Sequence, residues 1–219
     1  MTKLLVIRHG HAVGNAEHRF IGQTDVPLDA LGRLQAQALT ERLKSFPIDR
    51  IVSSDLSRAI DTITPLADAI GLPIEPDIRL REISNGEWSG LLPGEISARW
   101  PELWAAYRTG EDVLRPGGEQ WALVRERVVR ATREHAVSGG VIVVSTHGGP
   151  ALNLAQWAAG LPAGGNIFTG RLGALGNTSI TTIEIGGQSG DQVRLLGFND
   201  LGHLSGETPD ARLPLDPVD

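Results

Sequence analysis

The 219-residue sequence contains no cysteine, and this absence narrows the chemistry that the protein can perform. Disulfide bonds, thiolate nucleophiles and cysteine metal sites are all excluded. A chain without disulfides suits a reducing compartment, and we therefore expect a cytoplasmic protein.

Long apolar runs and an excess of positive charge are also missing. No apolar run approaches the length that spans a membrane. The N-terminal stretch "MTKLLVIRHG" has one lysine and only four consecutive apolar residues, too few for a signal peptide. The formal net charge is −6, from 20 Lys and Arg against 26 Asp and Glu, which argues against a surface for nucleic acid. We expect a soluble globular protein with no nucleic-acid or membrane partner.

Strand-like and helix-like segments alternate along the chain. Apolar runs at 4–7, 51–53 and 141–146 are typical of strands buried on both faces. Two more strands are predicted within 178–185 and 193–200. Helical spacing predicts helices from Asp29 to about Pro47, from about Ser57 to Gly71, from Trp121 onward, and from His147 to about Gly160. This alternation predicts an α/β fold, a three-layer sandwich whose mostly parallel sheet has helices on both faces.

Two of the predicted helices carry local signals. Pro65 lies inside the second helix and should kink or split it. In the helix from Trp121, Val124, Val128 and Ala131 recur at helical spacing and predict its buried face. The intervening residues 125–127 are charged and are expected to face water.

Residues 83–120 interrupt the alternation with a segment rich in aromatic residues. Four of the five tryptophans lie between 88 and 121. α/β enzymes often place a lid or specificity region in such an insertion. The other interpretation is a small helical subdomain with its own core, which we favour for Trp100 and Trp104 because they have (i, i+4) spacing. We expect one domain over 1–219 with this small helical insertion, and the tail at 205–219 is a candidate for disorder.

Charged side chains follow the predicted strands where those strands end. Ligands of open α/β sheets bind outside the carboxyl ends of the strands, so these side chains should meet there. The residues with this placement are Arg8, His9, Arg58, His147 and, at the start of the insertion, Glu82.

These residue types suit a phosphoryl group. Arginine offers permanently charged, bidentate donors to phosphate oxygens, and a neutral imidazole nitrogen can attack phosphorus. A carboxylic acid can protonate the leaving oxygen and then take a proton from water. Gly10 and Gly148 let the backbone approach closely beside each histidine. A single histidine after a strand is more often structural, and Arg58 alone could lie on a helix surface, so the interpretation depends on convergence.

The stretch "LVIRHGHAVGN" resembles the Arg-His-Gly signature of the histidine phosphatase superfamily, which contains cofactor-dependent phosphoglycerate mutases and many phosphatases. Further segments resemble family motifs in the same order along the chain. They are "RFIGQTDVPLDALGRLQAQAL", "IVSSDLSRAIDT", "LREISNGEWSG", "RPGGE", which resembles a helix-capping loop, "VIVVSTHGGP" and "NDLGHL". The resemblance thus covers nearly the whole chain.

The resemblance implies a reaction through phosphohistidine that needs neither a metal nor a cofactor. It implies that His9 is the nucleophile and Glu82 the proton donor. The side chains implied to hold the phosphoryl oxygens are those of Arg8, Arg58, Asn15 and His147. The resemblance also implies that the backbone around Ile21 and Gly22 binds substrate. We count Gly148 among the substrate-binding positions as well.

Several positions depart from the family pattern. His11 stands where Gln or Glu is common, Ala12 where Ser or Thr is common, and Gln120 where a serine often begins a helix. The mutases typically carry a lysine-bearing insertion after the acid, and no lysine lies between Glu82 and Pro116. We therefore expect a phosphomonoester hydrolase that acts on small phosphorylated metabolites.

Other functions stay open at this stage. One is a phosphoglycerate mutase, and another is a non-catalytic module that binds a phosphorylated ligand. A third is a metal-dependent barrel hydrolase, suggested by the pair His9 and His11. Phosphosugars, phosphoglycerate-derived esters, ribazole phosphate and phosphoserine are all open as substrates. The oligomeric state is open too, with a homodimer among the alternatives.

Overall fold

The computed structural model describes residues 1–13, 19–163, 172–187 and 192–204. The expected tail at 205–219 and the candidate residue Asn15 lie outside these ranges. Six strands form one sheet in the order β3-β2-β4-β1-β5-β6. Their bounds are β1 Thr2–Arg8, β2 Arg50–Ser53, β3 Ile74–Pro76, β4 Gly140–Thr146, β5 Ile180–Gly186 and β6 Gln192–Asp200.

The sheet is mixed. Strands β1 to β4 pair in parallel, whereas β5 pairs with β1 and with β6 in antiparallel fashion. The α/β fold is therefore confirmed, and the parallel arrangement expected for most of the sheet holds for four strands. The helices are α1 Ala30–Leu43, α2 Ser57–Ile70, α3 Pro93–Arg99, α4 Pro101–Arg108, α5 Trp121–Ala136 and α6 Gly148–Ala158, with short 3₁₀ turns η2 Ile78–Leu80, η3 Gly86–Trp88 and η5 Gly202–Leu204.

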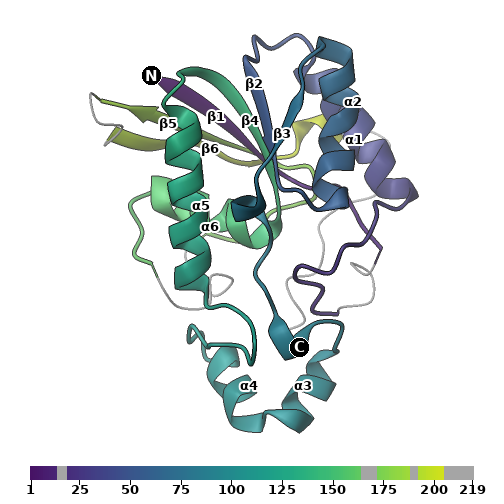
Figure 1. Cartoon of the computed structure of the whole chain (residues 1–219), viewed down its shortest axis with the longest axis vertical. Coiled ribbons are helices and arrows are strands. Elements are labelled where there is room, and N and C mark those ends of the chain that lie inside the picture. Colours follow the sequence, from purple (N-terminus) through teal and green to yellow (C-terminus); the bar gives the residue numbers. More distant parts are fainter. Residues whose placement is uncertain (14–18, 164–171, 188–191, 205–219) are drawn as a thin grey trace.

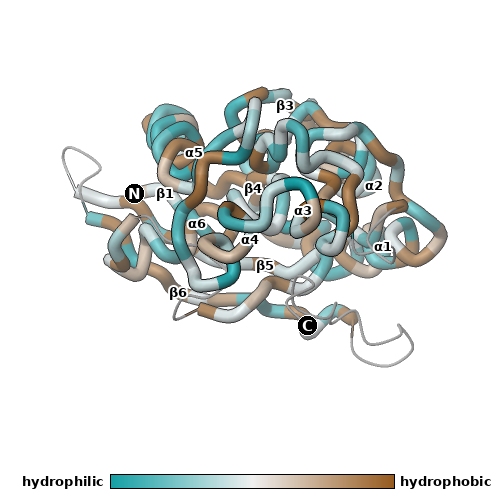
Figure 2. Tube along the Cα trace, turned by 90° about the horizontal axis from the view of Figure 1, so that it is seen from below, coloured by the Kyte–Doolittle hydropathy of each residue, from teal (hydrophilic) through white to brown (hydrophobic). Residues whose placement is uncertain are grey.

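Helices cover both faces of the sheet, as expected (Figure 1). Successive side chains of a strand point to opposite faces, and β1 shows this directly. Leu4 and Val6 join the core under α5 and α6, while Leu5 and Ile7 join the core under α1 and α2. The outer helices alternate between hydrophilic and hydrophobic positions along the chain (Figure 2). The apolar run of β1 is thus explained by burial on both faces.

Two helix predictions are corrected by the structure. Helix α2 continues unbroken through Pro65, so the proline does not split it. Proline removes the hydrogen bond to the carbonyl of Asp61, but Asp61 is exposed and water can satisfy that group. The start of α5 is capped by Asp112 and not by the "RPGGE" loop. Its carboxylate accepts from the backbone N–H groups of Trp121 (2.6 Å) and Ala122 (2.8 Å).

The insertion contains α3 and α4 and has a hydrophobic cluster of its own. Trp88 and Tyr107 are buried in it, and Trp100 and Trp104 pack against it. This confirms the expected core role of the two spaced tryptophans. They do not share one helix, however, because α3 ends at Arg99 and α4 begins at Pro101, with Trp100 as the residue between them. A lid function for residues 83–120 stays a prediction.

Within the described ranges, no helix is both long and apolar enough to cross a membrane. The parallel strands all end at one edge of the sheet, and the loops that follow their carboxyl ends meet there.

Candidate active site

Three strands end side by side at this edge. The pairing registers place Arg8, the last residue of β1, beside Thr146, the last of β4, and Ser53, the last of β2, beside Ser145. The next residue of each chain segment is polar: His9 after β1, His147 after β4 and Ser54 after β2. The rings of the two histidines lie edge to face, with 5.1 Å between their centroids. Segments far apart in the sequence thus bring the two predicted histidines together.

His9 is buried and held in one orientation. Its side chain is 6% exposed, and its Nδ1 lies 2.7 Å from the carbonyl oxygen of Gly10. A carbonyl oxygen only accepts, so Nδ1 carries the proton and the lone pair is on Nε2. Burial lowers the pKa of His9 well below its ordinary value, and the nearby charges of Arg58 and Arg8 lower it further. The imidazole is therefore neutral, with Nε2 able to act as a nucleophile.

His147 precedes helix α6 and is fully buried. Its Nε2 lies 2.8 Å from Oγ of Ser54. Its Nδ1 is buried and has no hydrogen-bond partner among the described residues. Burial also lowers the pKa of His147 well below its ordinary value, and the charge of Arg58 adds to this effect. One ring nitrogen of a neutral histidine thus remains for a ligand.

The two predicted arginines flank the histidines. The Nη1 of Arg8 donates to the carbonyl oxygen of Leu175. Arg58 is 2% exposed and donates to the carbonyl oxygens of Thr24 (2.9 Å) and Gly22 (2.8 Å). These bonds use two of its five N–H donors and set the direction of the remainder. Two fixed cations therefore lie next to His9.

Glu82 reaches the same place from the start of the insertion. Its Oε1 accepts from the backbone N–H of Ile83 (2.9 Å), and its Oε2 accepts from that of Gly149 (3.1 Å). A β-carbon on Gly148 would lie 3.5 Å from Nε of Arg8. At the start of α6, Gly148 therefore lies against Arg8, and Gly149 lies against the carboxylate of Glu82.

The remaining candidates occupy the loop that Arg58 holds. Gly22 has a positive φ of 54°, and a β-carbon there would lie 2.9 Å from the carbonyl oxygen of Ile83. Only glycine fits this position without strain. Ile21 precedes it, and its carbonyl oxygen accepts from the N–H of Thr24 (3.1 Å). The structure thus brings the loop at 21–24 next to Arg58.

His11 has a structural partner. Its Nδ1 lies 2.5 Å from Oδ2 of Asp29, the residue that caps α1 by accepting from the N–H of Gly32 (2.9 Å). The His11 contact and the bond from Gly32 lower the pKa of Asp29 against the opposing effect of burial. His11 therefore fixes the start of α1.

The sheet is open and not a closed barrel, so the barrel hydrolase suggested by His9 and His11 is wrong.

Five residues that support this site were not predicted from the sequence. Ser54 and Gly149 lie within segments already noted, "IVSSDLSRAIDT" and "VIVVSTHGGP"; Gly149 directly follows Gly148, and Ser54 lies four residues before Arg58. Gln23 donates from Nε2 to the carbonyl oxygen of Glu82 (2.9 Å), and Asn177 donates from Nδ2 to that of His9 (2.9 Å). Arg127 was expected to face water but contacts the backbone around Glu82. Contacts to backbone carbonyls leave no signal in a single sequence.

No group of three or more His, Cys, Asp or Glu side chains in the described part of the chain could hold a metal ion. The expected independence from metals stays a prediction. The arrangement forms a binding site suited to an anionic ligand, and it contains two cations, two neutral imidazoles and one carboxylate.

Comparisons with known proteins agree with this geometry. A profile of the histidine phosphatase superfamily (branch 1) matches residues 4–200. The glucosyl-3-phosphoglycerate phosphatase of Mycolicibacterium vanbaalenii is 37% identical over 82% of this chain and 82% of its own length. The phosphoglycerate mutase-like protein 4 of Arabidopsis thaliana is 34% identical over 93% of this chain and 87% of its own.

Solved structures give the same result. The native structure of a mycobacterial glucosyl-3-phosphoglycerate phosphatase superposes with a TM-score of 0.80 at 33% identity, covering 90% of this chain and 98% of the other. These findings confirm the family, the fold and the phosphatase class expected from the sequence, with mutase-like relatives also present. The chain belongs to the histidine phosphatase superfamily, branch 1.

Proposed function

We propose that this protein hydrolyses phosphate monoesters of small sugar-derived metabolites through a phosphohistidine at His9. The observation that carries the proposal is the buried neutral imidazole of His9, whose Nδ1 is held by Gly10 while Arg8 and Arg58 flank it. Glucosyl-3-phosphoglycerate is the first substrate to test, because relatives at 37% and 35% identity carry that name.

In the first step, Nε2 of His9 attacks phosphorus and the ester P–O bond breaks. Glu82, carrying a proton, donates it to the leaving oxygen. In the second step, water attacks phosphorus, Glu82 takes a proton from that water, and the P–N bond breaks to return its electron pair to Nε2. Inorganic phosphate and the free alcohol are the products.

The other side chains stabilise charge on the phosphoryl group. Arg8 and Arg58 offer fixed N–H donors to its oxygens, where such charge stabilisation is worth most. The Nδ1 of His147 supplies a further contact. Asn15, Ile21, Gly22 and Gly148 keep their proposed places around the substrate. The cytoplasmic location and a homodimer stay predictions.

Trapping of the phosphoenzyme tests the proposal. After brief reaction with labelled substrate, the label should survive alkali and be lost in acid, because phosphohistidine is acid-labile. His9→Asn should show no label, and EDTA should leave turnover unchanged. Phosphoglycerate interconversion faster than ester hydrolysis, with 2,3-bisphosphoglycerate present, would instead establish the mutase. Absence of any turnover would indicate a binding module.

The role of Glu82 is tested by comparing leaving groups. A p-nitrophenolate ion leaves without help, whereas an alkoxide needs a proton almost completely. Glu82→Gln should therefore lose about 10²–10⁴-fold in kcat/KM on an alkyl phosphate and far less on p-nitrophenyl phosphate. Arg58→Ala should harm both substrates about equally, because charge stabilisation is common to both. Equal damage by Glu82→Gln on both esters would contradict the proton-donor role.

A further inference from the structure

The guanidinium group of Arg127 lies against the segment that carries Glu82. The Arg127 side chain projects from α5 and is 15% exposed. Its Nη1 donates to the carbonyl oxygens of Arg79 (2.7 Å) and Arg81 (2.6 Å), and its Nη2 donates to that of Glu82 (2.9 Å). Three carbonyl groups of one four-residue segment therefore converge on one guanidinium.

Glu119, in the "RPGGE" loop, completes the arrangement. Its Oε1 accepts from Nε of Arg127 (2.9 Å) and its Oε2 from Nη2 (3.0 Å). The same Oε2 accepts from the backbone N–H of Ser84 (2.8 Å). All five N–H donors of Arg127 thus have acceptors. The backbone on both sides of Glu82 is held by one ion pair.

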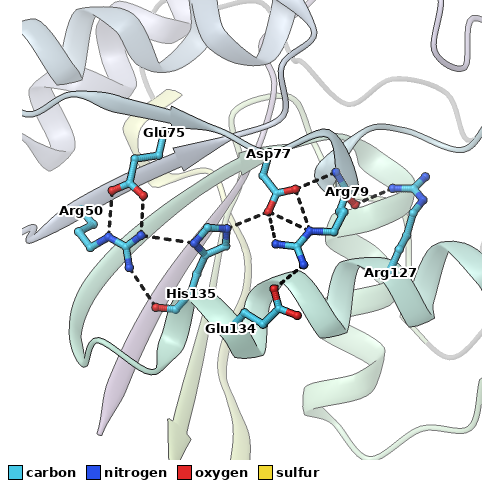
Figure 3. A network of polar contacts seen from close by, with 7 residues as sticks. All are labelled: Arg50, Glu75, Asp77, Arg79, Arg127, Glu134 and His135. Carbon is cyan, nitrogen blue, oxygen red and sulfur yellow. Dashed lines mark hydrogen bonds and ion pairs between the residues drawn. The ribbon is translucent and has the colours of Figure 1, made fainter.

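Helix α5 is also tied to the residues just upstream of this segment (Figure 3). His135 Nε2 lies 2.9 Å from Oδ2 of Asp77, and Glu134 pairs with Arg79. Burial raises the pKa of Asp77, but hydrogen bonds from Arg79 and His135 outweigh it and hold this pKa well below its usual range. Helix α5, which carries Arg127, is therefore attached to residues 77–79.

We propose that Arg127, with Glu119 as its counter-ion, is a positioning residue that fixes the Glu82 carboxyl group for proton transfer. The inference rests on the proposed role of Glu82. Lysine keeps the charge of Arg127 but has one nitrogen, so it cannot hold three carbonyl groups and a carboxylate together. Misplacing a reacting group by about 1 Å can cost about 10²-fold in rate. In kcat/KM the cost should fall on protonation of the leaving oxygen by Glu82 in the first step.

The test compares Arg127→Lys with Arg125→Lys, a matched control on the same helix. Arg125 also donates to two backbone carbonyl oxygens, those of Leu161 (2.7 Å) and Pro162 (2.8 Å), but away from Glu82. For each variant, kcat/KM is measured on an alkyl phosphate and on p-nitrophenyl phosphate, and thermal unfolding is recorded. Glu119→Gln serves as a second variant if Arg127→Lys does not fold.

Arg127→Lys should lose about 10²-fold on the alkyl ester and much less on the aryl ester, while Arg125→Lys matches the wild type on both. Added to Glu82→Gln, the lysine substitution should cause no further selective loss, because both act through one group. If Arg127→Lys loses equal activity on both esters while Glu82→Gln loses more on the alkyl ester, the positioning role of Arg127 is overturned and the role of Glu82 stands. If Glu82→Gln is not selective, the proton-donor role and this inference both fail.

Discussion

At the scale of single residues, the site depends on histidines that each have one nitrogen fixed and one available. Gly10 fixes Nδ1 of His9, and Ser54 contacts Nε2 of His147. Oγ of Ser54 also lies 3.4 Å from the backbone N–H of Leu56, which can donate to it. The hydroxyl group can then donate its own proton to Nε2 of His147, and in that tautomer Nδ1 carries the proton that a phosphoryl oxygen can accept.

Removal of the Ser54 hydroxyl group should therefore weaken phosphate binding. We expect Ser54→Ala to raise the inhibition constant of inorganic phosphate about fivefold, since one such hydrogen bond is worth about 1 kcal/mol. Ser53→Ala is the matched control, because the Ser53 hydroxyl donates to the carbonyl oxygen of Ser54 and does not contact His147. The same rise in both variants would show that the effect comes from the loop and not from His147.

At the scale of elements, the first turn of α6 connects the second histidine to the acid. A β-carbon on Gly149 would lie 2.4 Å from Oε1 of Glu82 and 2.4 Å from Cζ3 of Trp121. Trp121 is 3% exposed and belongs to the core, so it cannot move freely. The β-carbon of an alanine at 148 would meet only ordinary contacts. The two adjacent glycines are thus not equivalent.

Gly149→Ala should displace Glu82 and destabilise the protein. Overpacking of this kind costs about 1–3 kcal/mol, and the lost carboxyl position should lower kcat/KM on alkyl phosphates more than on aryl phosphates. Gly148→Ala is the control for packing alone: its β-carbon meets only ordinary contacts, so its melting temperature should be that of the wild type. Because Gly148 is proposed to lie beside the substrate, its activity is compared only as the ratio of alkyl to aryl kcat/KM. Activity and melting temperature of both variants decide this, and a wild-type profile for Gly149→Ala would refute the packing argument.

The same element shows what a sequence can and cannot predict here. The strands β1 and β4 were predictable because both faces are buried and their residues are continuously apolar. His9 and His147 were predictable because they follow those strands. Gly149 and Arg127 were not, because their partners are a carboxylate and backbone carbonyls brought near only by the fold. The split predicted at Pro65 does not occur, because the cost of a proline inside a helix depends on whether the orphaned carbonyl reaches water.

At the scale of the whole molecule, the sheet determines where charge is buried. The four parallel strands end at one edge of the sheet. Strand β5 runs the other way and begins at that edge, and β6, antiparallel to β5, ends there again. Arg8 and Arg58 are placed beside His9 and His147 at the edge, inside the folded protein. Folding therefore depresses the pKa of both histidines, and protonation of either would add a positive charge beside two others.

The free energy of unfolding should consequently depend on pH in a defined window. Above the ordinary histidine pKa of 6.5, His9 is neutral in both states and contributes no slope. Below it, the unfolded chain binds protons that the native protein does not, so stability falls as the pH decreases, by at most about 1.4 kcal/mol per pH unit for each histidine. Carboxyls such as Asp29, whose native pKa is lowered from 3.8, remain ionised in both states down to about pH 5.5.

Urea unfolding at pH 7.5 and pH 5.5, in buffers free of phosphate, measures this difference. The wild type should lose stability between these two values, and His9→Asn should lose less because one of the three histidines whose pKa is lowered, His9, His147 and His203, is gone. Phosphate must be left out, since a ligand that binds only the native state would itself stabilise it. An equal loss in both proteins would mean that His9 binds its proton as readily in the folded state as in the unfolded one. The proposed reaction, which requires a neutral His9 as the nucleophile, would then be wrong.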